Sequence, residues 1–378
     1  MPEPRTRFAA GCMTGTSLDG LDVALVKILG TGLDMKAELL GHHALSMPDD
    51  LRTTLMSLAS GEVNAPITFM RSARALGELH ADGLEQLFAQ LPDVACDFIT
   101  AHGQTIWHAP GDGEKELGGG PKSWQLFDPW PVVKRLGVPV CYDLRQADLI
   151  AGGQGAPLTP ITDWVMYREY ADAVANLGGI LNITRLGTDL SQVEGGDVYP
   201  CNLLLDGLCK RYFGKPYDAD GDIAGRGRIN PACVHLIDDA VQAACAGKQS
   251  LGREQFSPEW FDRLIASIGQ AHRPEDVLQT AARLVAVQLG GSFREPGQPT
   301  QRLVLAGGGV KNKTLVKLIK DQSYYDVQCS DDLGIPSEAR EAMAFAVLGA
   351  LSQDGVPISL PQVTGATAPG VAGTWSGL

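Results

Sequence analysis

The sequence predicts an α/β protein of two domains, and its length and two hairpin patterns carry that prediction. The chain has 378 residues, which is more than one domain usually holds. Residues 8–29 and 173–186 each contain two apolar runs joined by a polar or glycine-rich turn, as in a strand hairpin. We therefore expect two similar halves, domains 1–141 and 142–378, with the last residues able to return to the first.

The remaining elements follow from hydrophobic spacing. Apolar residues at helical intervals predict helices, and short apolar runs that end in polar or glycine-rich turns predict strands. The final helix is expected to carry a proline in its first turn. The predicted helices are 70–91, 202–213, 274–289 and 336–351, and the further strands are 98–100, 138–142 and 302–306.

Composition excludes several classes of function. A hydrophobic content of 44% and a charged content of 20% are typical of a globular protein. The net charge of −13 argues against nucleic acid or an anionic membrane as partner. The eight cysteines have no paired metal-site spacing, and no apolar run resembles a signal peptide or a membrane span. We expect reduced thiols and a cytoplasmic protein.

The turn of the first hairpin is the most informative stretch of the chain. Its backbone N–H groups and the hydroxyls of Thr14, Thr16 and Ser17 are suited to binding phosphate oxygens. Asp19 and Asp22 would repel a bare phosphate, so their presence implies a divalent cation. No Gly-Lys-Ser/Thr follows, which excludes a Walker A loop. An ordinary glycine-rich turn is the alternative.

Two further patterns suggest ligand contacts, and a third does not. Gly307, Gly308 and Gly309 end a strand before a helix that begins near Asn312, which favours close approach of a nucleotide, although a plain turn needs one glycine. His102 and Gln104 follow another strand and are suited to binding substrate hydroxyls. The spacing of His102 and His108 fits neither one helix face nor one strand face, so we do not predict zinc.

Beyond these patterns, the chain resembles the anhydro-N-acetylmuramic acid kinase family, within the actin, hexokinase and Hsp70 superfamily. The matching blocks occur in family order along nearly the whole chain. They are residues 11–25, 102–108, 143–145, 151–158, 176–180, 306–309 with Asn312, 334–336, 341–346 and 363–366.

The resemblance implies a ribonuclease H-like fold of two α/β domains, each around a five-stranded mixed sheet, with an interdomain cleft that closes on ATP and a sugar. It implies that water opens the 1,6-anhydro bridge of the sugar and that ATP phosphorylates the freed 6-oxygen, in cell-wall amino sugar recycling. ATP and Mg²⁺ are the implied cofactors, and a homodimer is plausible.

The resemblance also assigns residues. It implies nucleotide contacts at Gly15, Thr16, Ser17, Asp19, Gly20, Asp22, Gly178, Gly179, Gly307, Gly308, Gly309 and Asn312. It implies substrate contacts at His102, Gln104, Gln125, Asp128, Arg145, Gln154 and Asn202. Glu341 would hold Mg²⁺ alongside Asp19, which would act through water; the alternative is that Glu341 faces solvent.

Two of these assignments have structural alternatives. Asp197 aligns with the family's aspartate and would be the general base that deprotonates the attacking water; alternatively it caps the helix that starts near Asn202. Arg145 would bind a substrate carboxylate, or it would instead form an ion pair with Asp143 or Asp148.

The chain departs from the family where a sugar is expected. Tyr199, Pro200 and Cys201 replace a Gly-Pro-Gly turn, and Phe127 replaces another glycine. We expect these side chains to narrow the pocket, with Trp124 and Trp130 either stacking on a sugar or filling core. An altered anhydrosugar is one outcome. The alternative function is a nucleotide-binding homologue that has lost sugar turnover and acts as a sensor or regulator.

Overall fold

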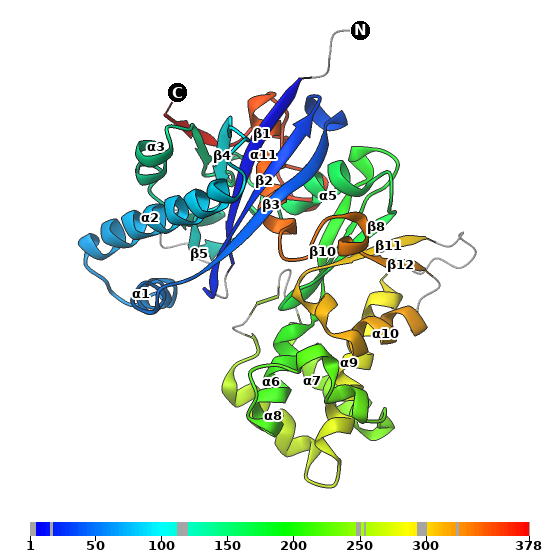
Figure 1. Ribbon diagram of the computed structural model, residues 1–378. Helices are drawn as coiled ribbons and strands as arrows, with labels where there is room; N and C mark the ends of the chain where they lie inside the picture. The colour runs from blue at the N-terminus through cyan, green and yellow to red at the C-terminus, as the bar shows by residue number, and fades with distance from the viewer. Residues whose placement is uncertain are drawn as a thin grey trace. The chain divides into compact units, whose positions relative to one another are not determined.

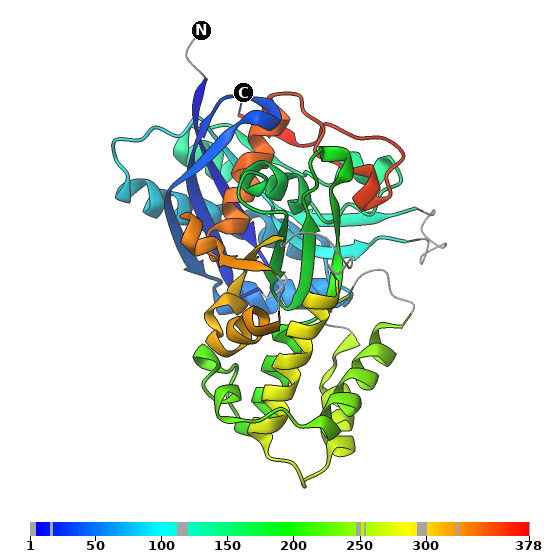
Figure 2. The same cartoon turned by 90° about the vertical axis from the view of Figure 1, so that its right-hand side faces the viewer.

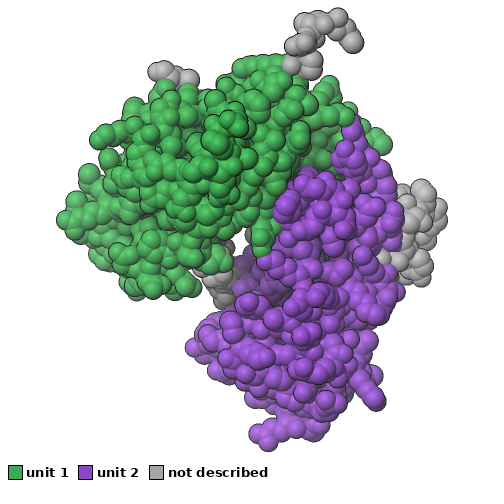
Figure 3. All heavy atoms as spheres, in the orientation of Figure 1, with its two compact units in different colours: residues 1–168, 188–194, 338–378 green, residues 169–187, 195–337 purple. Residues whose placement is uncertain are grey.

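The computed structural model describes residues 5–15, 18–111, 120–246, 251–252, 255–292, 301–322 and 325–377. The chain forms two compact units, which Figure 3 colours separately. Unit 1 comprises Met1–Arg168, Thr188–Glu194 and Glu338–Leu378, and unit 2 comprises Glu169–Gly187 and Gly195–Ser337. The chain therefore first passes from unit 1 to unit 2 after Arg168, whereas the sequence predicts a domain boundary after residue 141. Residues 142–168 stay in unit 1 because their helix packs against the helix that begins at Arg340.

Unit 1 is built on a six-stranded sheet with the order β13-β7-β4-β1-β2-β3. Strands β1, β2 and β3 are antiparallel neighbours, whereas β4 runs parallel to β1 and β7 runs parallel to β4. The strands are β1 (Thr6–Thr14), β2 (Gly20–Leu29), β3 (Lys36–Ser46), β4 (Phe98–Ala101), β7 (Val140–Tyr142) and β13 (Thr374–Ser376), and β5 (Gln104–Ala109) and β6 (Lys122–Leu126) form a separate hairpin. The helices are α1 (Asp49–Ala59), α2 (Pro66–Gln90), α3 (Trp130–Leu136), α4 (Gln146–Ile150), α5 (Thr159–Tyr167), α11 (Arg340–Gln353) and α12 (Pro361–Thr364).

Helices pack on both faces of this sheet, so its central strands are apolar on both sides. On one face, Ala10 and Cys12 of β1 share a core with α1 and α2. On the other face, Gly11 lies so close to the backbone of α11 that any side chain would collide with Ala342. Helices α1, α2 and α11 are labelled in Figure 1. The continuous apolar run of β1 in the sequence reflects this two-sided burial.

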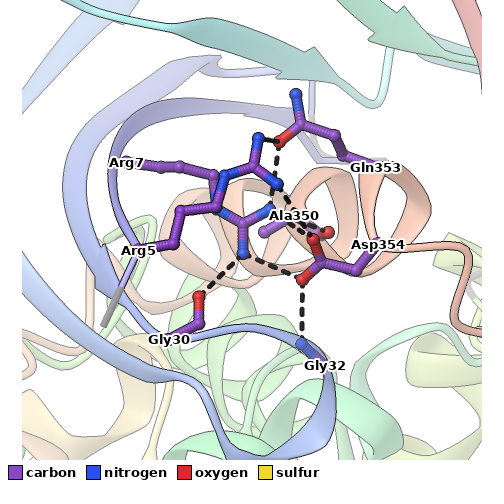
Figure 4. A network of polar contacts seen from close by, with 7 residues as sticks. All are labelled: Arg5, Arg7, Gly30, Gly32, Ala350, Gln353 and Asp354. Atoms are coloured by element: carbon purple, nitrogen blue, oxygen red, sulfur yellow. Dashed lines mark hydrogen bonds and ion pairs between the residues drawn. The ribbon is translucent and has the colours of Figure 1, made fainter. Parts of the chain in front are cut away.

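Arg7 fixes the carboxyl end of α11 to the sheet (Figure 4). Its guanidinium forms a bidentate ion pair with Asp354, at 2.8 and 2.9 Å, and its side chain is almost completely buried. Asp354 also accepts the Gly32 N–H at 2.8 Å. The other end of α11 differs from the prediction, because the helix begins at Arg340 and not at residue 336, so Pro336 lies before it.

Unit 2 repeats the same plan with a five-stranded sheet of order β10-β9-β8-β11-β12. Strand β9 is antiparallel to β8, while β11 runs parallel to β8 and β12 runs parallel to β11. Its strands are β8 (Ala173–Leu177), β9 (Ile180–Arg185), β10 (Glu194–Pro200), β11 (Arg302–Ala306) and β12 (Asp326–Cys329), and its helices are α6 (Asn202–Phe213), α7 (Pro231–Cys245), α8 (Pro258–Ile268), α9 (Pro274–Gly291) and α10 (Lys313–Gln322). Helices α6 to α9 gather below the strands in both ribbon views (Figures 1 and 2).

The shared strand order confirms the predicted α/β fold with two related units. In each, three consecutive strands lie side by side, and the first of them pairs in parallel with the next strand along the chain. The expectation of five strands per sheet is wrong for unit 1, because β13 adds a sixth by pairing antiparallel with β7. All eight cysteines lie in the described parts and are unpaired thiols. None of the described helices has the length and apolarity of a membrane span.

Candidate functional site

The turn between β1 and β2 is held by its own backbone and by the neighbouring turn. The Thr14 hydroxyl is buried and donates to the Gly103 carbonyl at 2.6 Å, so it is engaged within the protein and is not directed at phosphate as the sequence suggested. Leu18 has a φ of 56° and its N–H donates to Gly15 at 3.2 Å, which makes the turn tight. Thr16 and Ser17 lie outside the described residues.

Carboxylates flank this turn. Asp19 is exposed, and its carbonyl accepts the Met47 N–H at 3.0 Å. Asp22 is hydrogen-bonded to the His42 ring at 3.2 Å, a neighbour that the sequence gave no reason to expect. Glu341 lies in the first turn of α11 and is half-buried, so the predicted solvent-facing alternative does not describe it.

Glu341 is influenced by several charged neighbours, among them Asp22 near the start of β2. Burial raises the pKa of Glu341, and the negative charges of Asp22 and Asp163 add to that effect against Arg340 and Arg145. A half-buried carboxylate near a second carboxylate is an oxygen donor set that suits Mg²⁺. Within the described residues, however, three or more His, Cys, Asp or Glu side chains do not gather at one point.

Arg145 lies in a buried polar cluster at the start of α4. Its Nη1 donates to the Gly155 carbonyl at 2.6 Å, and its Nη2 lies 2.9 Å from Nε2 of His102. Within the described parts of the chain its Nε is buried without a partner, and the predicted ion pair with Asp143 or Asp148 is not formed. Burial lowers the pKa of Arg145 to about 10, against the opposing charges of Asp148 and Glu341, so the guanidinium stays charged at neutral pH.

His102 and Gln104 complete the cluster. Burial and the charge of Arg145 lower the pKa of His102 to about 3, which keeps its ring neutral, so Nε2 accepts the hydrogen bond from Arg145. The Gln104 side chain is 1% exposed, and its Oε1 has no partner among the described residues. A half-buried cation with one buried, unpartnered N–H and a buried acceptor without a partner together indicate a ligand at this place.

The β5–β6 hairpin and the residues directly after it include the predicted substrate residue Gln125 and the two tryptophans Trp124 and Trp130. Gln125 Nε2 donates to Thr105 Oγ1 at 3.1 Å and to Ser123 Oγ at 2.7 Å. Trp124 stacks on Phe69 with a centroid distance of 5.4 Å and is 49% exposed, so it does not fill core, and a sugar contact stays a prediction. Trp130 is more than half exposed.

Asp128 has structural partners. Its Oδ2 forms an ion pair with Arg74 at 2.8 Å, and its Oδ1 accepts the Trp130 N–H at 3.0 Å at the start of α3. These contacts hold the end of the hairpin against α2 and α3. A substrate role for Asp128 stays a prediction.

In unit 2, the β8–β9 turn meets the start of α6. The Gly179 carbonyl accepts the N–H groups of Cys201, at 2.9 Å, and Leu203, at 3.1 Å, while Gly178 accepts that of Asn202 at 3.0 Å. The Asn202 amide in turn donates to the Leu177 carbonyl at 3.0 Å. These hydrogen bonds hold Gly178 and Gly179 of the turn against Asn202 at the start of α6.

The glycine series after β11 is explained in part by packing. Gly307 has a φ of 83°, and a Cβ there would collide with Asn176; a Cβ at Gly309 would collide with Leu177. At Gly308, nothing lies within 4 Å of the position a Cβ would take. Asn312 caps α10 by accepting the Leu315 N–H at 2.9 Å. Of the three glycines, only Gly308 has no conformational or packing reason in the protein itself.

Asp197 is exposed on β10, and its Oδ2 accepts the Leu251 N–H at 2.9 Å. The alternative that it caps α6 is wrong, because Cys201 is the capping residue and makes no side-chain cap. The base role assigned to Asp197 stays a prediction.

Tyr199 and Cys201 lie in the core of unit 2, which contradicts the expectation that they narrow a pocket, whereas Phe127 is half-buried beside the unit 1 core. Tyr199 is 2% exposed, packs in the unit 2 core, and donates from its hydroxyl to Asp238 at 3.1 Å. Cys201 is 0% exposed. Phe127 packs against the rings of His80 and Tyr142. Sequence alone could not show this, because it does not give the direction of a side chain.

Comparison with known proteins now settles the family. The family model for anhydro-N-acetylmuramic acid kinase matches residues 7–376. The chain belongs to this family. An anhydro-N-acetylmuramic acid kinase of Bordetella petrii is 36% identical over 97% of this chain and 95% of its own length. One from Salinibacter ruber is 34% identical over 96% of this chain and 94% of its own length.

Among solved structures, component A of the Acidaminococcus fermentans (R)-2-hydroxyglutaryl-CoA dehydratase is 10% identical, with a TM-score of 0.47 over 90% of this chain and 96% of that chain. A ROK hexokinase from Thermus thermophilus is 12% identical, with a TM-score of 0.33 over 91% of this chain and 98% of that one. The assignment to the anhydro-N-acetylmuramic acid kinase family, a family of ATP-using phosphotransferases, rests on the full-length sequence matches.

Proposed function

We propose that the chain uses ATP to convert 1,6-anhydro-N-acetylmuramic acid into its 6-phosphate, with release of ADP. The observation that carries the choice of sugar is Arg145, a half-buried cation whose Nε is buried without a partner and which forms no ion pair in the described parts of the chain. This sugar bears a lactyl carboxylate, and a guanidinium is the side chain best suited to bind a carboxylate. His102 and Gln104 would bind its hydroxyl or amide groups.

The proposed reaction begins with water, which attacks the anomeric carbon as Asp197 accepts its proton. The bond between C1 and O6 breaks, and O6 takes the γ-phosphoryl group of ATP. A single displacement at C1 inverts its configuration. A divalent cation, for which Glu341 and Asp19 are the proposed holders, would neutralise phosphate charge when bound. Gly308 and the backbone around it would admit the nucleotide.

The alternative of a sensor or regulator that has lost turnover has less support than the sequence suggested. It was motivated by the loss of the Gly-Pro-Gly turn, and Tyr199 and Cys201 both pack inside unit 2. Buried replacements leave no reason to expect a blocked sugar site. A homodimer in the cytoplasm remains part of the proposal on the family resemblance, and light scattering of the purified protein tests the dimer.

The proposal is tested by incubating the protein with Mg²⁺-ATP and the anhydrosugar and following ADP release and the 6-phosphate by ³¹P NMR. We expect turnover, and we expect Arg145→Gln to weaken use of this sugar about 100-fold, the order of one charge-assisted hydrogen-bond pair. The carboxylate-free analogue 1,6-anhydro-N-acetylglucosamine should be affected much less. ATP binding without ADP release from any anhydrosugar would instead support the sensor.

A further inference from the structure

The last of the family blocks, residues 363–366, has no part in the chemistry described above, yet it contacts the loop that holds Arg145. Thr364 is 2% exposed, and its hydroxyl donates to Oδ1 of Asp148 at 2.6 Å. Its carbonyl accepts the Gln154 N–H at 2.9 Å. Two groups of one residue therefore hold both ends of the segment 148–154, which lies more than two hundred positions earlier in the chain.

Asp148 is the centre around which this segment folds. Its carboxylate is 1% exposed. Gly155 donates its N–H to Oδ2 at 2.7 Å, and Gly153 donates its N–H to the Asp148 carbonyl at 2.9 Å. Gly153 lies so close to the carboxylate that a Cβ would collide with it. Gly153 is therefore explained by a loop that wraps a buried carboxylate, since only glycine can approach so closely, whereas Gly152 and Gly155 have positive φ values of 81° and 72°.

The loop also contacts Arg145 directly, through the peptide of Gly155. The same Gly155 that donates to Asp148 accepts a hydrogen bond from Arg145 Nη1 at 2.6 Å. Asp148 forms no ion pair with Arg145, and its two oxygens accept the Thr364 hydroxyl and the Gly155 N–H instead. The carboxylate is satisfied without using the guanidinium, which remains able to bind a ligand.

We propose that Thr364 and Asp148 are positioning residues that set the guanidinium of Arg145 for the carboxylate of the substrate. The inference rests on the proposed function of Arg145. Under this proposal, residues 363–366 do not contact the sugar themselves. They fix the direction of the Arg145 side chain, which binds it. The chain of contacts runs from the Thr364 hydroxyl to Asp148, to the Gly155 peptide, and to Arg145 Nη1.

The test is Thr364→Val, which keeps the shape of the side chain and removes its hydroxyl. We expect kcat/KM for anhydro-N-acetylmuramic acid to fall about tenfold, mainly through KM, because a binding contact is misplaced. The inhibition constant of 1,6-anhydro-N-acetylglucosamine, which lacks the carboxylate, should change less than twofold. Thr364→Ser, which restores the hydroxyl, should recover most of the loss.

Thr367→Val is the matched control. Thr367 donates from its hydroxyl to the Ala151 carbonyl at 2.9 Å, so this variant removes a similar bond to the same loop without reaching Asp148. We expect it to leave both sugars unchanged. Asp148→Asn, nearly the same in shape, provides a second variant if Thr364→Val does not fold, and the same selective loss is expected.

The outcomes separate the two proposals. If Arg145→Gln discriminates between the two sugars and the folded Thr364 and Asp148 variants do not, the positioning role is overturned and the proposed function stands. If Thr364→Val weakens both sugars equally, or Thr364→Ser fails to restore the acid sugar, Thr364 has only a general structural role. If Arg145→Gln does not discriminate, the carboxylate contact and the positioning role both fail.

Discussion

The two units present their candidate ligand groups in different ways. In unit 1 the candidate sugar contacts are side chains: His102 and Gln104 are buried, and the half-buried Arg145 is held by its hydrogen bonds to Gly155 and His102. In unit 2 the candidate groups are glycine backbone and one exposed carboxylate, Asp197. The unit 1 cluster is thus pre-organised by packing, which is how a protein binds a defined sugar. The unit 2 groups depend on open space and backbone direction, which suit a nucleotide that approaches the main chain.

The comparison also separates glycines that serve the fold from a glycine that admits a ligand. Gly153 packs on Asp148 in unit 1, and Gly307 and Gly309 pack on neighbouring backbone or side chains in unit 2. Gly308 alone in that series faces open space. A glycine-rich motif is therefore weaker support for a ligand than it looks, and each position must be judged by what a Cβ would meet.

The largest expected effect tests whether the exposed carboxylate of unit 2 does chemistry. Asp197→Asn should lower kcat about 1,000-fold, as loss of a general base does, and leave ATP binding unchanged by calorimetry. Glu194→Gln, on the same strand, is the control and should retain full turnover. An Asp197→Asn enzyme with normal kcat would show that Asp197 is not the general base.

The next test asks whether Tyr199 belongs to the core or to the sugar site. Tyr199→Gly restores the family residue but empties a buried position, so the free energy of unfolding should fall by about 4 kcal/mol in urea titration. Tyr199→Phe, which loses only the bond to Asp238, should cost about 1 kcal/mol. Unchanged stability of Tyr199→Gly together with a new sugar preference would show that the ring lines the pocket.

Acid should weaken unit 1 through its buried histidines. Burial lowers the pKa of His80 from its ordinary value of 6.5 to about 4, although its bond to the Leu76 carbonyl opposes this. Between about pH 6.5 and about pH 4, His80 is therefore protonated in the unfolded chain but neutral in the folded protein. The free energy of unfolding falls as pH drops through this range, and His80 contributes about 3 kcal/mol to the decrease. His80→Gln should have a shallower pH profile, with the exposed His235→Gln as control; a profile as steep as that of the unchanged protein would contradict this.

The smallest effect distinguishes the glycines of unit 2. Gly308→Ala should raise KM for ATP about tenfold, if the nucleotide approaches there, with stability changed by less than about 0.5 kcal/mol. Gly309→Ala should show the reverse, a loss of about 2 kcal/mol in stability because its Cβ meets Leu177. Equal KM for Gly308→Ala and the unchanged protein would place the nucleotide elsewhere.

Much of this could be read from the order of residues. The hairpins at β1–β2 and β8–β9, the strand β11 and helices such as α6 followed from local apolar spacing, which depends on near neighbours. The start of α11 was misplaced, because Pro336 looked like a helix opening and the chain instead turns before Arg340. The sixth strand was missed, because β13 pairs with β7 across more than two hundred residues.

The family, the two-part α/β plan and the residue types available for the reaction can all be inferred from the order of residues, because motifs and periodicity are local properties of a chain. The direction of each side chain depends on the folded protein. Folding turned Tyr199 into the core, left Arg145 without an ion pair in the described residues, and brought Thr364 to Asp148. Those outcomes depend on contacts between distant segments, where packing and the need to satisfy buried polar groups select one arrangement.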